Sequence, residues 1–210
     1  MTQHRHAAAM AALALTAALA GAALAQAPAA PPKFPAGQKD FTLAPAGTYQ
    51  LDPQHAGVIA RVSHLSYSMS VFRFDKATGT LKWDPAAPTK SSLTAVVEPG
   101  SITSNVAGFA TALAGDKFLK AKAFPQATFV SSAFRQTDAT HGQVDGALTL
   151  MGKTVPATFD VTLIGAGAAF GSPRIGVQAR TTLKPQDFGL QLGTTDPIEI
   201  VVDVEFERQK

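Results

Sequence analysis

Apolar and charged side chains alternate near the end of the chain, in the segment IEIVVDVEFE at residues 198–207. Apolar residues occupy every second position from Ile198 to Phe206, and most positions between them carry a carboxylate. Because successive side chains of a β-strand point to opposite faces of a sheet, this pattern predicts a strand with one apolar and one charged face. Such a row of charges is typical of an exterior in contact with solvent.

Segments with similar patterning follow one another from residue 47 onward, separated by turn-forming residues. They predict eight or more strands, over residues 48–52, 57–66, 70–84, 91–99, 127–136, 143–152, 154–165, 173–183 and 198–207. Short antiparallel strands of this kind are typical of a sandwich or a barrel, in which the apolar faces are buried.

Two stretches interrupt the strand pattern. Residues 104–125 are rich in alanine and predict short helices capped by Asn105 and Asp116 and ended by Pro125. Residues 184–189 predict a further helical turn.

The size of the side chains that face inward decides whether such a domain has a cavity. A closed barrel of about eight strands is either filled by its own side chains or has room for one small ligand. The positions that we expect to face inward include small residues, namely Ala60, Ala95, Ala147 and Ala179. They favour a cavity, and a self-filled β-sandwich that acts as an interaction module is the alternative.

The first residues have the layout of a secretory signal peptide, because Arg5 precedes an uncharged, alanine-rich run that ends in small residues. We therefore predict a signal peptide over 1–25 and export to the periplasm. Residues 26–46 are rich in proline and alanine and predict an extended linker. Residues 47–210 then form one domain.

Composition excludes several kinds of chemistry. The chain has no cysteine, which removes thiol catalysis and thiolate metal sites. Its formal net charge is only +3 and its lysines are scattered, so nucleic acid is not an expected partner. Nucleophile and metal-binding motifs do not occur, and GAGAAFG at 165–171 lacks the spacing of a phosphate-binding loop. We therefore expect neither an enzyme nor a metal or cofactor.

Four stretches, in this order, resemble the YceI-like family of exported lipid-binding proteins. They are YQLDPQHAGVIARVSH from Tyr49, DKFLKAKAFPQATFVSS from Asp116, GQVDGALTLMGKTVPATFDVTL from Gly142 and QDFGL from Gln186. The resemblance implies an all-β fold, an extended antiparallel β-barrel of lipocalin type with one or two short helices in the 105–124 region and near 185–189. It further implies that the ligand is a long polyisoprenoid lipid, such as an isoprenoid quinone, held in the pore. A transient membrane contact for loading and a homodimer are compatible with that role.

Strand patterns and the resemblance together suggest the residues that meet the lipid. The expected lining is Val58, Ala60, Val62, His64, Phe72, Phe74, Phe118, Phe129, Phe159, Val161, Val177, Phe188, Val202 and Val204. The expected contacts to a headgroup are His55, His64, Lys184 and Asp187. An enzyme with a site around His55 and His64 is the second alternative.

The chain departs from the family pattern at four positions. Ala60 replaces a usual phenylalanine, Phe72 a frequent glycine, and Ala77 a further phenylalanine. Pro185 stands where the family often has arginine, with Lys184 beside it as a point charge that lacks the planar fork of arginine. These departures predict a pore of altered shape.

Overall fold

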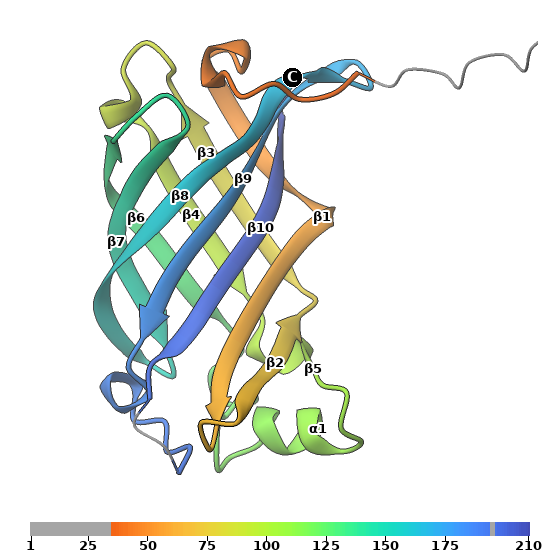
Figure 1. Ribbon diagram of the computed structural model, residues 1–210, viewed down its shortest axis with the longest axis vertical. Coiled ribbons are helices and arrows are strands. Elements are labelled where there is room, and N and C mark those ends of the chain that lie inside the picture. The colour runs from red at the N-terminus through yellow and green to blue at the C-terminus, as the bar shows by residue number, and fades with distance from the viewer. Residues whose placement is uncertain (1–34, 194–195) are drawn as a thin grey trace, which may run out of the picture. The chain divides into compact units, whose positions relative to one another are not determined.

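Ten antiparallel strands form one sheet that closes into a barrel in this computed structural model, which describes residues 35–193 and 196–210 (Figure 1). The strands are β1 (Gly47–His64), β2 (Ser68–Phe74), β3 (Ala77–Trp83), β4 (Ser92–Val97), β5 (Ile102–Thr103), β6 (Ala127–Gln136), β7 (His141–Leu150), β8 (Lys153–Ala169), β9 (Ser172–Leu183) and β10 (Ile198–Arg208). The sheet order is β10-β9-β8-β7-β6-β4-β3-β1-β2-β5, and pairing of β10 with β1 closes eight of the strands into a ring. The predicted antiparallel barrel is confirmed, and the predicted signal peptide lies outside the described residues.

Strand β1 is the seam of the barrel. Its first residues pair with β3, its last residues pair with β2, and β10 follows its other edge. We expected the chain to leave the sheet at Pro53, but β1 continues beyond it. Between Leu51 and Ala56 the register against β10 shifts, so residues 52–55 form a bulge that accommodates a proline without a backbone donor.

The predicted strand over 70–84 is divided into β2 and β3. Asp75 and Lys76 separate them, and the backbone N–H of Asp75 donates to Ser101 at 3.2 Å. Strand β2 therefore extends the sheet beyond the ring, with the short β5 on its outer edge.

The interruption after β5 contains a single short helix, α1 (Phe109–Ala114). It begins later than expected, because Gly108, with φ of 74°, takes the cap position in place of Asn105. Asp116 starts no second helix, since the following chain folds back and the N–H of Leu119 donates to Leu113 at 2.9 Å. The predicted turn near 184–189 is confirmed as the 3₁₀ helix η4 (Pro185–Phe188).

Residues 35–46 pack on the barrel, although we expected them to belong to an extended linker. We call this segment the strap; it contains the 3₁₀ helix η1 (Phe41–Leu43). Its carbonyl oxygens accept hydrogen bonds from two large side chains of the barrel. Trp83 Nε1 donates to Ala44 O at 3.1 Å, and Tyr49 Oη donates to Pro45 O at 2.7 Å. The linker prediction failed here because a composition rich in proline and alanine shows neither the contact with Trp83, 39 residues away in sequence, nor the contact with Tyr49 on the adjoining strand.

The two ends of the barrel differ in what closes them (Figure 1). The strap end carries residues 35–46, the β6–β7 and β8–β9 turns, the β3–β4 connection with 3₁₀ helix η2 (Pro88–Lys90), and the C-terminus. The α1 end carries α1, 3₁₀ helix η3 (Pro99–Ser101), η4, and the β1–β2 and β7–β8 turns. Each end has its own apolar cluster, one around Tyr49 and Phe206 and the other around Ile102 and Leu119. In the described part of the chain, no helix has the length and apolar character needed to cross a membrane.

Candidate functional site

A cavity of about 310 Å³ lies inside the barrel, between the two apolar clusters. All eight strands of the ring contribute to its wall, and most of the lining side chains are aliphatic or aromatic. Small-molecule sites usually measure about 300 to 1,000 Å³, so the cavity is large enough for a ligand and lies at the low end of that range.

The cavity is long and narrow. On β10 it is lined by Ile200, Val202, Val204 and Phe206, which are alternate residues of the strand with which the sequence pattern began. The six residue steps from Ile200 to Phe206 span roughly 20 Å along the strand. A strand tilt of about 40° reduces this length to about 15 Å along the barrel axis. A hollow of this shape suits an extended chain better than a compact metabolite.

Small side chains leave the space open. Ala179 lies beside Val161 of β8 and Val202 of β10, and all three line the cavity. All three are only half-buried although they face inward. The expected inward position of Ala147 is wrong: it is exposed, because the neighbouring Leu148 occupies the inward face of β7.

The structure divides the residues that we expected to contact lipid into two groups. Eight line the cavity: Val58, Phe74, Phe129, Phe159, Val161, Val177, Val202 and Val204. The others lie toward the α1 end, where Ala60, Val62, Phe72 and Phe118 belong to or pack on the apolar cluster, Phe188 is buried in η4, and His64 is exposed. For these residues a contact with lipid stays a prediction.

The departures from the family pattern compensate one another in space. Ala60 and Phe72 are direct partners in the β1–β2 pair, so bulk that the family usually places on β1 comes here from β2. The Phe72 ring packs edge-on against Phe109 of α1, with centroids 5.7 Å apart. Ala77 lines the cavity, where a phenylalanine would reduce its volume.

His55 lies in the β1 bulge, outside the cavity lining, and takes part in a cluster of charged groups. Its Nδ1 lies 2.8 Å from Asp52 Oδ2, and Arg174 Nη1 lies 3.0 Å from the same oxygen. The hydrogen bond with His55, together with those from the Gln54 backbone and Arg174, lowers the pKa of Asp52 from 3.8 to about 2. The same bond with Asp52 raises the pKa of His55. The cluster joins the bulge to β9 and β10.

This cluster is a poor metal site. Asp52, His55 and Glu205 offer ligand atoms within 4.8 Å of one another. The guanidinium of Arg174, however, lies 3.4 Å from Glu205 as well as against Asp52, and its positive charge disfavours a cation there.

The two histidines of the enzyme hypothesis do not share a site. His64 ends β1 at the α1 end, eight residues beyond Ala56, a separation of roughly 26 Å along the strand. Lys184 and Asp187 are exposed around η4, also outside the cavity lining. A headgroup contact by any of these four residues stays a prediction.

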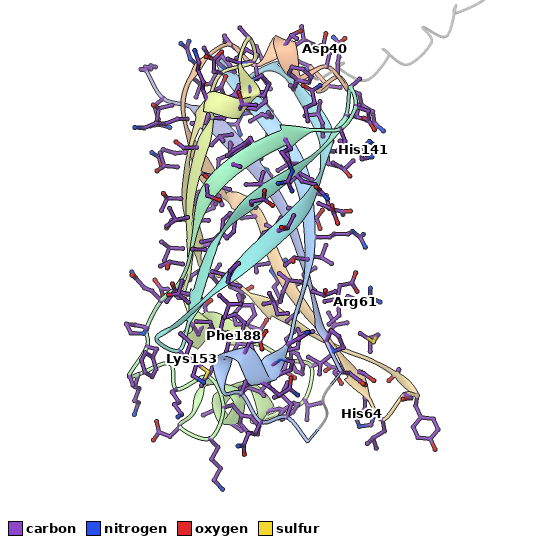
Figure 2. All side chains as sticks on the ribbon, turned by 90° about the vertical axis from the view of Figure 1, so that its left-hand side faces the viewer. Asp40, Arg61, His64, His141, Lys153 and Phe188 are labelled. Carbon is purple, nitrogen blue, oxygen red and sulfur yellow. The ribbon has the colours of Figure 1, made fainter. Side chains whose placement is uncertain are left out.

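The polar part of the cavity wall is concentrated at the strap end, along the β6–β7 hairpin. Asp138, Thr140 and His141 border the cavity there, with Gln136 and Gln143. Figure 2 shows His141 toward the same end of the barrel as Asp40 of the strap. The Thr140 N–H at 2.7 Å, followed by the imidazole of His141 at 2.9 Å, lowers the pKa of Asp138 from 3.8 to about 2. The sequence cluster TDATHG predicts only a turn, and nothing in it indicates that this turn meets a cavity.

Steric contacts explain two glycines of the stretch that begins at Gly142 and resembles the family. A Cβ at Gly146 would overlap the Val130 carbonyl oxygen and the Phe129 ring, and one at Gly142 would lie 2.7 Å from the Arg135 carbonyl oxygen. Gly146 therefore lets β7 approach β6 where β6 bulges between Ser131 and Ala133, and Gly142 allows the same close approach at the end of the pair, opposite Gln136.

Residues 49–207 match the sequence model of the YceI-like domain. The chain belongs to the YceI-like family. A UPF0312 protein of Pseudomonas putida (strain W619) is 37% identical over 170 residues, which cover 79% of this chain and 88% of that protein. Protein YceI of Salmonella newport (strain SL254) is 33% identical over 171 residues, which cover 79% of this chain and 89% of that protein.

Solved structures show the same YceI-like barrel. BcnA of Burkholderia cenocepacia superposes with a TM-score of 0.66 at 26% identity, covering 74% of this chain and 98% of that chain. A polyisoprenoid binding domain from Saccharophagus degradans, implicated in plant cell wall breakdown, superposes with a TM-score of 0.57 at 16% identity. That match covers 77% of this chain and 98% of the other and shows a shared fold.

Proposed function

We propose that this protein binds a polyisoprenoid lipid of the isoprenoid quinone type in its barrel cavity and carries it through the periplasm. The observation that carries the proposal is an elongated apolar cavity whose polar groups lie mainly at one end. Membership of the YceI-like family and the fold shared with a polyisoprenoid binding domain support it. The protein acts as a carrier and not as an enzyme.

The cavity volume limits how much lipid fits between the present walls. At about 30 Å³ for each water-sized group, 310 Å³ holds about ten groups, or two isoprene units of five carbons. At about 0.8 kcal/mol for each buried carbon, two units contribute roughly 8 kcal/mol before the cost of ordering the chain. A longer tail has to extend past one of the closed ends.

The headgroup belongs at the strap end. Asp138 and His141 border the cavity there, and Gln136 and Gln143 offer amide donors and acceptors. The opposite extremity of the cavity is lined by apolar residues such as Leu119 and Leu150, where a quinone carbonyl would lose its hydrogen bonds with water.

Trp83 allows a direct binding assay, because it is the only tryptophan of the chain and lines the cavity. Titration with a short-chain isoprenoid quinone should quench its fluorescence, and the matching prenol without a quinone ring should compete. Mass spectrometry of an organic extract from protein purified in the presence of lipid should detect the natural ligand. Protein that yields no lipid and shows no Trp83 response would rule out the carrier function.

A further inference from the structure

Large apolar side chains project into solvent at the α1 end. Leu65 and Tyr67 in the β1–β2 turn are 76% and 88% exposed, and Val106, just before α1, is 56% exposed. Phe109 of α1, which contacts Phe72 of β2, is 38% exposed. A single exposed leucine is ordinary, whereas several exposed apolar residues at one end of a domain indicate an interaction surface.

Local backbone preference does not explain the tip of this turn. Leu65 and Ser66 have φ of 52° and 60°, and the N–H of Tyr67 donates to His64 O at 3.0 Å, which is the pattern of a type I′ turn. Such turns favour Asn-Gly, because a residue with a Cβ loses roughly 1–2 kcal/mol in the left-handed region. The chain therefore has a leucine at a position that disfavours it, and that leucine gains little burial in return.

The same end carries a group of exposed lysines. Its longest connecting segment, residues 104–126, has three lysines against one aspartate, and Lys153 at the start of β8 and Lys184 before η4 add two more. None of these five lysines forms an ion pair with another residue in the described ranges 35–193 and 196–210. They are Lys117, Lys120, Lys122, Lys153 and Lys184.

This surface is continuous with the structure that closes the cavity. Leu119 lies between two of these lysines in sequence, belongs to the apolar cluster and lines the cavity. Among the described residues, the backbone hydrogen bonds of segment 105–124 are internal to that segment and its neighbour Ser104. The strap, in contrast, exchanges two backbone bonds between Gln38 and Ala166 of β8, at 2.8 and 2.9 Å. The α1 segment can therefore move from the barrel without breaking backbone bonds to a strand.

We propose that the α1 end docks on an anionic phospholipid membrane. Leu65 and Tyr67 enter the interfacial region, the five lysines contact phosphate headgroups, and the α1 segment retreats so that lipid passes between membrane and cavity. Aromatic rings and lysines are the residues that anchor proteins at membrane interfaces, and lysines add electrostatic attraction to anionic lipids. The proposal rests on the carrier function, since it assigns where the lipid is exchanged.

Co-sedimentation with vesicles of phosphatidylglycerol and phosphatidylcholine, or of phosphatidylcholine alone, tests the proposal. The wild type should bind the anionic vesicles more tightly. The double variant Leu65→Asn/Tyr67→Ser should bind at least tenfold more weakly. The triple variant Lys117→Gln/Lys120→Gln/Lys122→Gln should lose roughly 100-fold on anionic vesicles, at about fivefold for each lysine.

Matched controls come from the strap end. Phe170 is 79% exposed and has φ of 53°, so Phe170→Asn reproduces the tip substitution at the other end. The triple variant Lys39→Gln/Lys90→Gln/Lys210→Gln removes the same charge there. Both controls should bind vesicles like the wild type.

Three results would overturn the docking proposal. They are wild-type protein that does not bind anionic vesicles, controls that lose as much affinity as the α1-end variants, and tip variants that change only the oligomeric state, which would assign the surface to a protein contact. Trp83 quenching by a quinone supplied in detergent separates the two proposals. A protein that responds to the quinone but ignores vesicles retains the carrier function and loses the docking site.

Discussion

Replacing Ala179 by leucine tests whether the barrel interior is empty in solution. Ala179 lies near the middle of the cavity, where Val161 and Val202 flank it on the neighbouring strands. The leucine adds three carbon atoms, which occupy roughly 90 Å³ at about 30 Å³ each. This is under a third of the 310 Å³ cavity, so the larger side chain fits without displacing the wall.

The substitution should affect stability and binding in opposite directions. Three carbons buried in a void contribute at most about 2.4 kcal/mol, at about 0.8 kcal/mol each. For a folded unit of this size, that corresponds to a rise of about 5–10 °C in Tm. The same leucine excludes about three carbons of the ligand, and the loss of a similar free energy weakens binding roughly 50-fold.

Thermal unfolding followed by circular dichroism and quinone titration followed by Trp83 fluorescence measure the two effects. The matched control is Ala147→Leu, which makes the same change on the exposed face of β7 and should leave both values nearly unchanged. If the interior were already filled, Ala179→Leu would overpack it and lower stability by about 1–3 kcal/mol. That result, with an unaffected control, would refute the presence of a ligand cavity.

Other sites give sharp expectations. Gly146→Ala should destabilise the protein by roughly 1–3 kcal/mol in urea unfolding, because its Cβ would overlap the Val130 carbonyl; unchanged stability would contradict the close β6–β7 approach. Tyr49→Phe should cost about 1–2 kcal/mol in the same assay, since the buried hydroxyl bonds the strap. His55→Ala should lower the urea midpoint most between about pH 4 and 6.5: the lowered pKa of Asp52 stabilises the fold above 3.8, and the raised pKa of His55 stabilises it below 6.5. An equal effect at pH 9 would contradict this pairing.

Much of the fold could be predicted because alternation specifies which face of a strand is buried. Strand β6 has the predicted limits, and β10 presents the predicted inward residues. The limits of β1 could not be predicted, because Pro53 ends a strand in isolation and only pairing with β10 on both sides of the bulge carries the chain past it. The inward position predicted for Ala147 was wrong, because a short alternating run does not specify which of its two faces is buried. The packing of the neighbouring Leu148 against the cavity decides this.

The candidate site could be predicted less completely than the fold. A strand pattern identifies inward residues, but it does not say how far along the barrel the cavity extends before the closing segments begin. Phe72 and Phe118 face the interior of the domain and still pack into the α1-end cluster, because α1 and its flanking residues occupy that end. The polar groups of Asp138 and His141 border the cavity because the tertiary fold places their turn there. The local sequence of the turn does not indicate this position.

The difference between the two ends determines where a long lipid tail can go. The present walls hold about two isoprene units, so a longer chain requires one end to give way. The strap end resists, because backbone bonds to Ala166 and the side chains of Trp83 and Tyr49 hold the strap in place. The α1 end is closed by apolar side chains such as Phe72 and Leu119, and a lipid tail is an apolar group that can replace their contacts. A tail that extends toward α1 therefore exchanges one apolar contact for another, whereas a tail that extends through the strap leaves polar groups without partners.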